Sequence, residues 1–499
     1  MRDFLRISPK DNVAVALTGL PAGYRINGDG LTLELNEAVN PGHKFALKHI
    51  AAGEKVIKYG FPIGEAKVSI APGEHVHVHN LKTLLGSDLC YSYTPSGAAG
   101  LSEEALAGRK RVFMGYERPD GSAGVRNDIW IIPTVGCMNS CAREIESRCQ
   151  ALAGNGIDAV VALTHPYGCS QMGDDQENTR EAISALIRHP NAGGVLVLGL
   201  GCENSNIGVL KEGYLKDCDL SRVRFLQGQD VTDEVEEGIR LVNTLVEEAR
   251  RIRRTEISVE KLIVGLKCGG SDGFSGITAN PAVGRFSDLL NAAGGSTILT
   301  EVPEMFGAET ILMDRCENEE IFNKTVKLIN GFKDYYRSHN QTIYENPSPG
   351  NKEGGISTLE DKALGCTQKS GFAPVVDVLA YAERVKKRGL NLLSAPGNDL
   401  VSSTALALSG AQIVLFTTGR GTPFAGVVPT VKISSNTPLN VHKNNWMDFN
   451  AGSLLEDGVR LEDIGAGLYD FVIGVAGGES VKSEAGYRDL AIFKQGVTL

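Results

Sequence analysis

Short stretches in which apolar and polar residues alternate fill the first 92 residues of the chain. Examples are LTLELNEA (31–38), EKVIKYG (54–60) and AKVSIA (66–71), which glycines and prolines separate. A period of two is typical of half-buried strands, and the breakers between them are typical of turns. Residues 1–92 are therefore predicted to form a small β domain.

The pattern changes after residue 92. Residues 93–111 are rich in small and charged residues, as linkers are. Beyond them, helix-like segments alternate with apolar runs, namely DIWIIPTV (128–135), DAVVALTH (158–165), GGVLVLGLG (193–201) and KLIVGLKC (261–268). This alternation predicts βαβ units around mainly parallel sheets, and therefore an α/β protein.

One helix and a second domain boundary also follow from the pattern. Apolar residues at helical spacing predict a helix packed along one face, and they are Val235, Ile239, Val242, Val246 and Ala249. Residues 255–260 intervene between this helix and the next apolar run. We therefore expect one α/β domain over 112–255 and a C-terminal α/β domain over 256–499.

Composition and charge narrow the class of protein. A chain of 499 residues exceeds what one hydrophobic core usually serves. Its formal charge of −10 argues against broad binding to nucleic acid or to an anionic membrane. The N-terminus has no signal-peptide pattern, no apolar segment is long enough to span a bilayer, and ten cysteines at this length fit reduced thiols. We expect a cytoplasmic protein.

The segment GEHVHVHN (73–80) holds three of the nine histidines at alternate positions. In a strand, His75, His77 and His79 point to one face, and Val76 and Val78 point to the other. Neutral imidazole is the commonest metal ligand and the usual general base. The segment therefore predicts a metal or acid–base site, and the alternative is a solvent-facing strand whose polar side is histidine.

Cysteines recur beside glycine and polar residues in four places. The segments are THPYGCSQMGDD (164–175), GLGCENSN (199–206), GLKCGGSDG (265–273) and LGCTQKSG (364–371). Since ligands bind beyond the carboxyl ends of parallel strands, their cysteines could meet in one cleft, and they are Cys169, Cys202, Cys268 and Cys366. The alternative for each is a small packing residue. Cys137 and Cys141 in GCMNSC do not match an iron–sulfur spacing, so packing is favoured there.

Two cations near strand ends are candidates for holding a carboxylate. Arg420 lies in GRGTPFAG (419–426), which lacks the continuation of a dinucleotide or phosphate motif. Lys432 follows shortly after. Arginine would bind a carboxylate with two parallel hydrogen bonds and lysine as a point charge, while the alternative for both is an ordinary surface charge.

Several segments together resemble the altronate and galactarate dehydratase family. They span nearly the full chain, and they are GEHVHVHN, RPDGSAGVRND (118–128), THPYGCSQ, GLGCE, FTTGRGTPFAGVVPTVKISSN (416–436) and WMDFNAG (446–452). The resemblance implies an N-terminal β-clip domain of the type called SAF and a larger α/β catalytic portion. It also implies a sugar-acid dehydratase that depends on a divalent metal, Fe²⁺ or Mn²⁺. The segment TVKISSNTPLNVHKNNWMDFNAG (430–452) is more similar to the altronate branch.

The chemistry of such a dehydration suggests expected roles for individual residues. Dehydration beside a carboxylate needs a base at C2, stabilisation of an enediolate and an acid at the C3 hydroxyl. The expected metal ligands are His75, His77, His79, Cys169 and Cys268. The expected catalytic residues are His165, Lys267 and Cys169, with a buried structural histidine as the alternative at 165. The expected substrate-binding residues are Arg126, Asn127, Arg420 and Lys432.

Other functions stay open at this point. One is dehydration of galactarate or of another aldarate or aldonate. Another is an iron–sulfur dehydratase that uses several of Cys137, Cys169, Cys202, Cys268 and Cys366. A third is a non-catalytic sugar-acid sensor, which the clustered histidines disfavour. The expected partner is a small sugar acid, with no nucleic acid and no membrane, and the oligomeric state is open, a homo-oligomer included.

Overall fold

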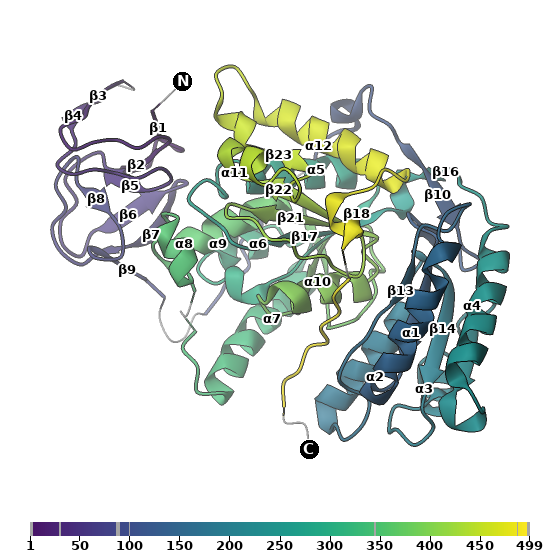
Figure 1. Cartoon of the computed structure of the whole chain (residues 1–499). Helices are drawn as coiled ribbons and strands as arrows, with labels where there is room; N and C mark the ends of the chain where they lie inside the picture. The colour runs from purple at the N-terminus through teal and green to yellow at the C-terminus, as the bar shows by residue number, and fades with distance from the viewer. Residues whose placement is uncertain are drawn as a thin grey trace.

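The computed structural model describes residues 3–28, 31–85, 90–98, 100–343, 346–486 and 488–496. A small strand-rich unit at the N-terminus packs beside two larger parts that contain both helices and strands (Figure 1). The predicted α/β class, with a small N-terminal β domain and mainly parallel sheets behind it, is confirmed. Within the described ranges no helix is both long and apolar enough to cross a membrane.

The small N-terminal unit consists of short antiparallel strands in three sheets. One sheet has the order β1-β2-β5-β8 and contains Phe4–Leu5, Val13–Ala16, Lys44–Ala46 and His75–Val76. A hairpin pairs β3 (Arg25–Gly28) with β4 (Leu31–Glu34), and a third sheet joins β6 (Lys55–Lys58), β7 (Phe61–Ala66) and β9 (Leu81–Lys82). Apolar side chains of this unit share a core with Ala363 and Leu364 from the C-terminal part. The unit is therefore docked on the rest of the chain.

The middle part is a four-stranded parallel sheet with the order β13-β12-β14-β15. Its strands are β12 (Asp128–Pro133), β13 (Val160–Ala162), β14 (Ala192–Gly199) and β15 (Val223–Gln227). Helices α1 (Asn139–Cys149) and α4 (Glu234–Ala249) pack together against it, and α2 (Gly173–Ile187) and α3 (Ile207–Gly213) contribute to a separate core. The helix predicted from the apolar stripe is confirmed as α4, which Asp233 caps at its N-terminus.

A three-stranded antiparallel sheet connects the middle part to its flanking segments. Strand β10 (Val112–Glu117) pairs with β11 (Ala123–Gly124) and with β16 (Thr255–Ser258). The strands through which the chain enters and leaves the middle part, β10 and β16, therefore lie side by side.

The C-terminal part is built on a seven-stranded parallel sheet with the order β19-β20-β18-β17-β21-β22-β23. In chain order its strands are β17 (Ile263–Cys268), β18 (Ser296–Leu299), β19 (Val375–Leu379), β20 (Gly389–Leu393), β21 (Ile413–Thr418), β22 (Thr430–Ser434) and β23 (Phe449–Asn450). The neighbours of β17 are β18 on one side and β21 on the other, so the connections change direction there. Ligands bind at such a point, outside the carboxyl ends of the strands.

Helices cover both faces of this sheet. Buried residues of α5 (Ala279–Ala292) and α12 (Leu461–Ala476) share one core with β17, and α10 (Asp399–Leu408) packs in another. The remaining helices are α6 (Glu309–Met313), α7 (Glu319–Ser338), α8 (Pro349–Glu353), α9 (Leu359–Thr367) and α11 (Thr437–His442). Helices α8 and α9 lie toward the small N-terminal unit (Figure 1). They place the carboxyl edge of the sheet close to the histidine segment.

Candidate active site

The histidine segment begins as a strand and then turns. Strand β8 contains only His75 and Val76, because the Asn80 side chain accepts from the His77 backbone N–H at 2.9 Å and donates to the His75 carbonyl at 2.8 Å. Val76 is buried, whereas Val78 is exposed. The predicted alternation is therefore wrong beyond Val76, and a side-chain-capped turn replaces it.

The turn nevertheless gathers the imidazoles. The ring centroid of His75 lies 5.5 Å from that of His77 and 5.6 Å from that of His79. A fourth ring, His43, joins them from the residue before β5, with its Nδ1 3.0 Å from His75 Nε2. His43 is distant in sequence, so the local motif gave no signal for it.

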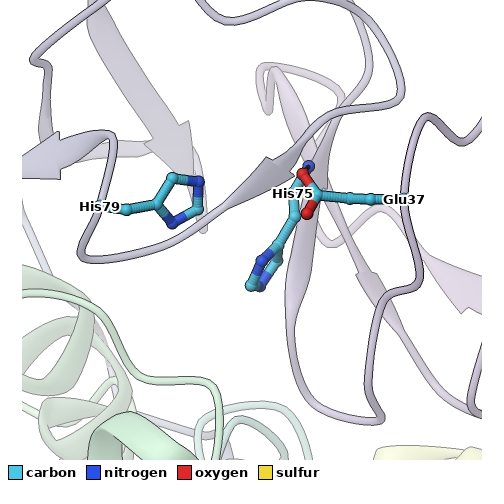
Figure 2. Close-up of side chains that lie close together, drawn as sticks. All are labelled: Glu37, His75 and His79. Atoms are coloured by element: carbon cyan, nitrogen blue, oxygen red, sulfur yellow. Dashed lines mark hydrogen bonds between the residues drawn. The ribbon is translucent and has the colours of Figure 1, made fainter.

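Three groups of the small unit form a candidate metal site. The ligand atoms of Glu37, His75 and His79 all lie within 4.8 Å of one another (Figure 2). Burial, followed by the charge of nearby His43, lowers the pKa of His75 to about 4. The ring is therefore uncharged at neutral pH and has a lone pair to offer. Two imidazoles and a carboxylate suit a divalent transition ion of intermediate hardness.

The histidines face a segment of the C-terminal part. His77 Nδ1 lies 2.9 Å from Ser357 Oγ, and His43 Nε2 lies 3.0 Å from the Glu353 carbonyl oxygen. Burial, followed by the charge of Lys44, lowers the pKa of His77 to about 3. The two parts of the protein thus meet at uncharged imidazoles.

Two buried lysines fix this contact. Lys44 Nζ donates to the Gly355 carbonyl at 2.8 Å, to Ser357 Oγ at 2.8 Å and to Asp361 Oδ2 at 2.9 Å. Lys58 Nζ donates to the other oxygen of Asp361 at 3.0 Å. Both lysines come from the small unit, and all three charged groups are buried. Two ammonium groups of the N-terminal part therefore share one carboxylate of the C-terminal part.

Arg420 is the predicted substrate-binding residue that lies near the histidines. It follows β21, and its Nη2 donates to Glu353 Oε2 at 3.1 Å, while the Glu353 backbone contacts His43. The Arg420 side chain is 46% exposed, so its guanidinium is available to a ligand. Arg420 is thus a partly exposed cation whose partner, Glu353, also contacts His43.

A second group of metal-ligand type lies deeper, at the end of β17. Cys268 Sγ and Cys366 Sγ are 3.5 Å apart, and both donate to Glu304 Oε2, at 2.9 and 3.2 Å. Two lysines already supply positive charge to this group. Lys369 Nζ lies 2.8 Å from Cys268 Sγ, and Lys362 Nζ lies 2.8 Å from Glu304 Oε1. An additional cation does not fit beside two buried ammonium groups. The group at the histidines is therefore the better candidate for a metal site.

Lys267 belongs to the same buried network. Its Nζ lies 2.7 Å from Glu301 Oε1 and 2.8 Å from Asp399 Oδ1. Burial alone would lower the pKa of Lys267, but these two carboxylates outweigh it and raise the pKa above its ordinary value. Lys267 is thus a fixed cation rather than a base.

The structure separates the other predicted catalytic and metal-binding residues from the histidines. His165 is buried in the middle part, where its Nε2 lies 2.8 Å from the Pro133 carbonyl and its Nδ1 accepts from the Tyr167 N–H. Burial lowers the pKa of His165 to about 4. With both ring nitrogens bonded to backbone, it has the surroundings of a structural histidine. Cys169 is exposed and belongs to neither ligand group among the described residues.

Three of the predicted substrate-binding residues instead hold elements together. Arg126 makes two hydrogen bonds to the carboxylate of Glu484, at 2.7 and 2.8 Å. The Asn127 amide donates to the Gly156 and Ala249 carbonyls. Lys432 donates to carbonyls of the 422–424 loop, and burial lowers its pKa to about 8. These side chains are largely enclosed, so neither their contacts nor their burial indicates a ligand.

Comparison with known proteins assigns each part of the chain to one kind of enzyme. Residues 2–84 match the altronate/galactarate dehydratase SAF domain, residues 115–250 match the D-galactarate dehydratase/altronate hydrolase second domain, and residues 259–498 match the D-galactarate/altronate dehydratase C-terminal domain. Altronate dehydratase of Bacillus subtilis is 55% identical over the whole of both chains. Altronate dehydratase of Escherichia coli is 50% identical, covering 99% of this chain and all of that one. Galactarate dehydratase (L-threo-forming) of Escherichia coli is 34% identical, covering 95% of this chain and 93% of that one.

Proposed function

Because the chain belongs to the D-galactarate/altronate dehydratase family, we propose that it removes water from D-altronate to give 2-dehydro-3-deoxy-D-gluconate. The protein is a hydro-lyase, as the sequence predicted. The observation that carries the substrate is the identity of 55% and 50% to two altronate dehydratases over the full chain, against 34% to a galactarate dehydratase.

The metal that this family requires is proposed to lie at Glu37, His75 and His79. Two imidazoles and one carboxylate favour Fe²⁺ or Mn²⁺ over softer ions, which prefer thiolates. When bound, the ion supplies Lewis-acid stabilisation of the negative charge that develops on substrate oxygen.

The residues around this site divide the remaining tasks. Arg420 binds the substrate carboxylate through its planar fork of N–H groups. His77 is uncharged, and its Nδ1 lies 2.9 Å from Ser357 Oγ. In the proposed tautomer Nδ1 carries the proton and donates to this hydroxyl, so that Nε2 has the lone pair that removes the C2 proton. Lys44 also donates to Ser357 Oγ and thereby fixes the hydroxyl that orients the ring.

The free thiols agree with an intracellular site of action. All ten cysteines are unpaired, including the exposed ones. Exposed free thiols persist in a reducing compartment. They therefore support a cytoplasmic location for an enzyme that acts on a small sugar acid.

Competition between two sugar acids tests the proposed substrate. With D-altronate and galactarate at equal concentration, we expect altronate to be converted preferentially, because a site shaped for a terminal hydroxyl leaves a second carboxylate without a charged partner. The two 2-keto-3-deoxy products are separated and quantified. Preferential conversion of galactarate would overturn the substrate while leaving the dehydratase assignment intact.

The role of Arg420 is tested by a conservative change. Arg420→Lys keeps the charge but loses the second parallel hydrogen bond, so KM for altronate should rise roughly 10- to 100-fold. The matched control is Arg460→Lys, since Arg460 is also exposed and paired with a carboxylate, that of Asp463, but lies away from the site. The measurement is KM for altronate in both variants by steady-state kinetics. An unchanged KM in Arg420→Lys would contradict the proposed role of Arg420 in substrate binding.

A further inference from the structure

Three cysteines of the middle part lie beyond the carboxyl ends of three adjacent parallel strands. Cys137 follows β12, Cys169 follows β13 and Cys202 follows β14, and β12 lies between the other two strands. All three are free and exposed. The proposed dehydration site uses none of them, although the carboxyl edge of a parallel sheet is where such folds bind ligands.

Hydrogen bonds join the three loops that carry these cysteines. The Gly136 N–H donates to the Tyr167 carbonyl at 2.8 Å, which joins the first loop to the second. The Ser205 N–H donates to the Gly168 carbonyl at 3.2 Å, which joins the second loop to the third. Thr134 Oγ1 donates to Glu203 Oε1 at 2.5 Å, which joins the first loop to the third. Each loop therefore contacts both of the others.

Each of the three cysteines follows a glycine, and the packing explains why. Gly168 has a φ of +107°, and a Cβ there would lie 2.0 Å from the Thr134 carbonyl oxygen. Gly201 has a φ of +130°, and a Cβ there would lie 2.6 Å from Gln229 Oε1. At Gly136 a Cβ would lie 3.1 Å from the Pro166 carbonyl. The backbone at Gly168 and Gly201 therefore requires glycine, while at Gly136 glycine allows a close approach of the two loops that a side chain would loosen.

The three thiols do not form a site for a single ion. Among the described residues, the groups whose ligand atoms all lie within 4.8 Å of one another do not include them. An iron–sulfur cluster places its thiolates farther apart, since each sulfur binds a different iron. Cys141 is not a fourth ligand here, because its thiol donates to Glu234 Oε1 at 3.3 Å.

A buried hydroxyl in the same region also lacks a partner. Ser205 is fully buried, three residues after Cys202, and its Oγ makes no hydrogen bond. A buried hydroxyl without a partner is costly unless something accepts its proton. Inorganic sulfide of a cluster accepts such hydrogen bonds.

We propose that Cys137, Cys169 and Cys202 bind a [4Fe–4S] cluster. Each thiolate binds one iron, and the fourth iron keeps a position for an oxygen ligand that the protein does not supply. This site is separate from the histidine site and does not depend on the proposed substrate. The local spacing GCMNSC gave no signal for it, because the ligands come from three strands rather than from one motif.

Anaerobic reconstitution of the full chain with equal amounts of ferrous and ferric iron and with sulfide tests the proposal, since a [4Fe–4S]²⁺ cluster contains two irons of each oxidation level. We expect visible charge-transfer absorbance and about four irons and four acid-labile sulfides per chain. Single changes of Cys137, Cys169 or Cys202 to serine should each lower the bound sulfide at least several-fold. Cys90→Ser is the matched control, since Cys90 is also exposed and free. The His75→Ala, His79→Ala double variant should keep the cluster, which separates it from the histidine site.

A second measurement uses the unmodified chain. Reconstitution should protect Cys137, Cys169 and Cys202 from alkylation, as read by mass spectrometry, while Cys90 stays reactive. Iron bound without labile sulfide, or equal alkylation of all four thiols before and after reconstitution, would overturn the proposal. So would a chromophore that survives all three serine changes in variants whose circular dichroism matches that of the unmodified chain.

Discussion

Replacing His75 and His79 together with alanine should remove the bound divalent ion and lower kcat/KM on the order of a thousandfold, because Lewis-acid stabilisation of the transition state contributes several kcal/mol. The fold should survive this change. His79 is exposed, and the buried Val76 that supports the segment is untouched. Only one of the three proposed ligands, Glu37, would remain, which is too few to retain the ion.

The measurements are metal content of the purified protein and steady-state kinetics with added Fe²⁺ or Mn²⁺. His49→Ala is the control, since His49 is an exposed histidine of the same small unit whose Nε2 contacts Ser69. His77→Ala should behave differently again, losing turnover while keeping the metal, because His77 is proposed to move a proton rather than to bind the ion. Normal metal content and turnover in the double variant would contradict the assignment.

The fold followed from the sequence wherever the signal was local and periodic. The apolar runs at 128–135 and 193–201 gave buried parallel strands, and the stripe ending at Ala249 gave helix α4. In these segments burial on one or both faces fixes the period of the apolar residues. The pattern alone is therefore sufficient to predict the strand or helix. The predicted small β domain followed in the same way from short alternating stretches between breakers.

The site was predictable only in part, because its contacts join distant segments. GEHVHVHN correctly drew attention to the imidazoles, but Asn80 ends the strand through side-chain bonds that alternation does not reveal. Glu37 and His43 lie at least 30 residues before the motif. Ser357 approaches from a different part of the chain. No local periodicity encodes such encounters.

The recurring Gly-Cys motifs show the same limit. They were expected to converge on one cleft, but the fold divides them between two sheets. Cys169 and Cys202 extend from the four-stranded sheet, while Cys268 and Cys366 lie together at the seven-stranded sheet beside Glu304. Cys169, Cys202 and Cys268 lie at or after the ends of strands, whereas Cys366 lies within α9. Only the order of the strands determines which ends are neighbours.

The proposed site requires the small unit to stay docked on the C-terminal part. The small unit supplies the metal ligands and His77, and the C-terminal part supplies Ser357. The buried carboxylate of Asp361 contributes to this contact through ion pairs with two lysines of the small unit. Burial alone would raise its pKa, but Lys44 and Lys58 outweigh burial and hold the pKa well below its ordinary value. Removing this carboxylate would leave two buried ammonium groups without a counter-charge.

Asp361→Ala should therefore weaken docking of the small unit by about 3 to 5 kcal/mol, the usual result of deleting one partner of a buried ion pair. We expect an earlier transition in urea, faster protease cleavage in the 93–111 segment and loss of turnover, since Lys44 would no longer hold Ser357 against His77. Asp361→Asn keeps the shape and removes only the charge, so it separates packing from electrostatics. Glu65→Ala is the matched control, because it deletes the partner of Lys82 in a solvent-exposed pair worth less than about 1 kcal/mol. If Asp361→Ala and Glu65→Ala shifted the urea transition equally, the buried ion pair would not be what holds the two parts together.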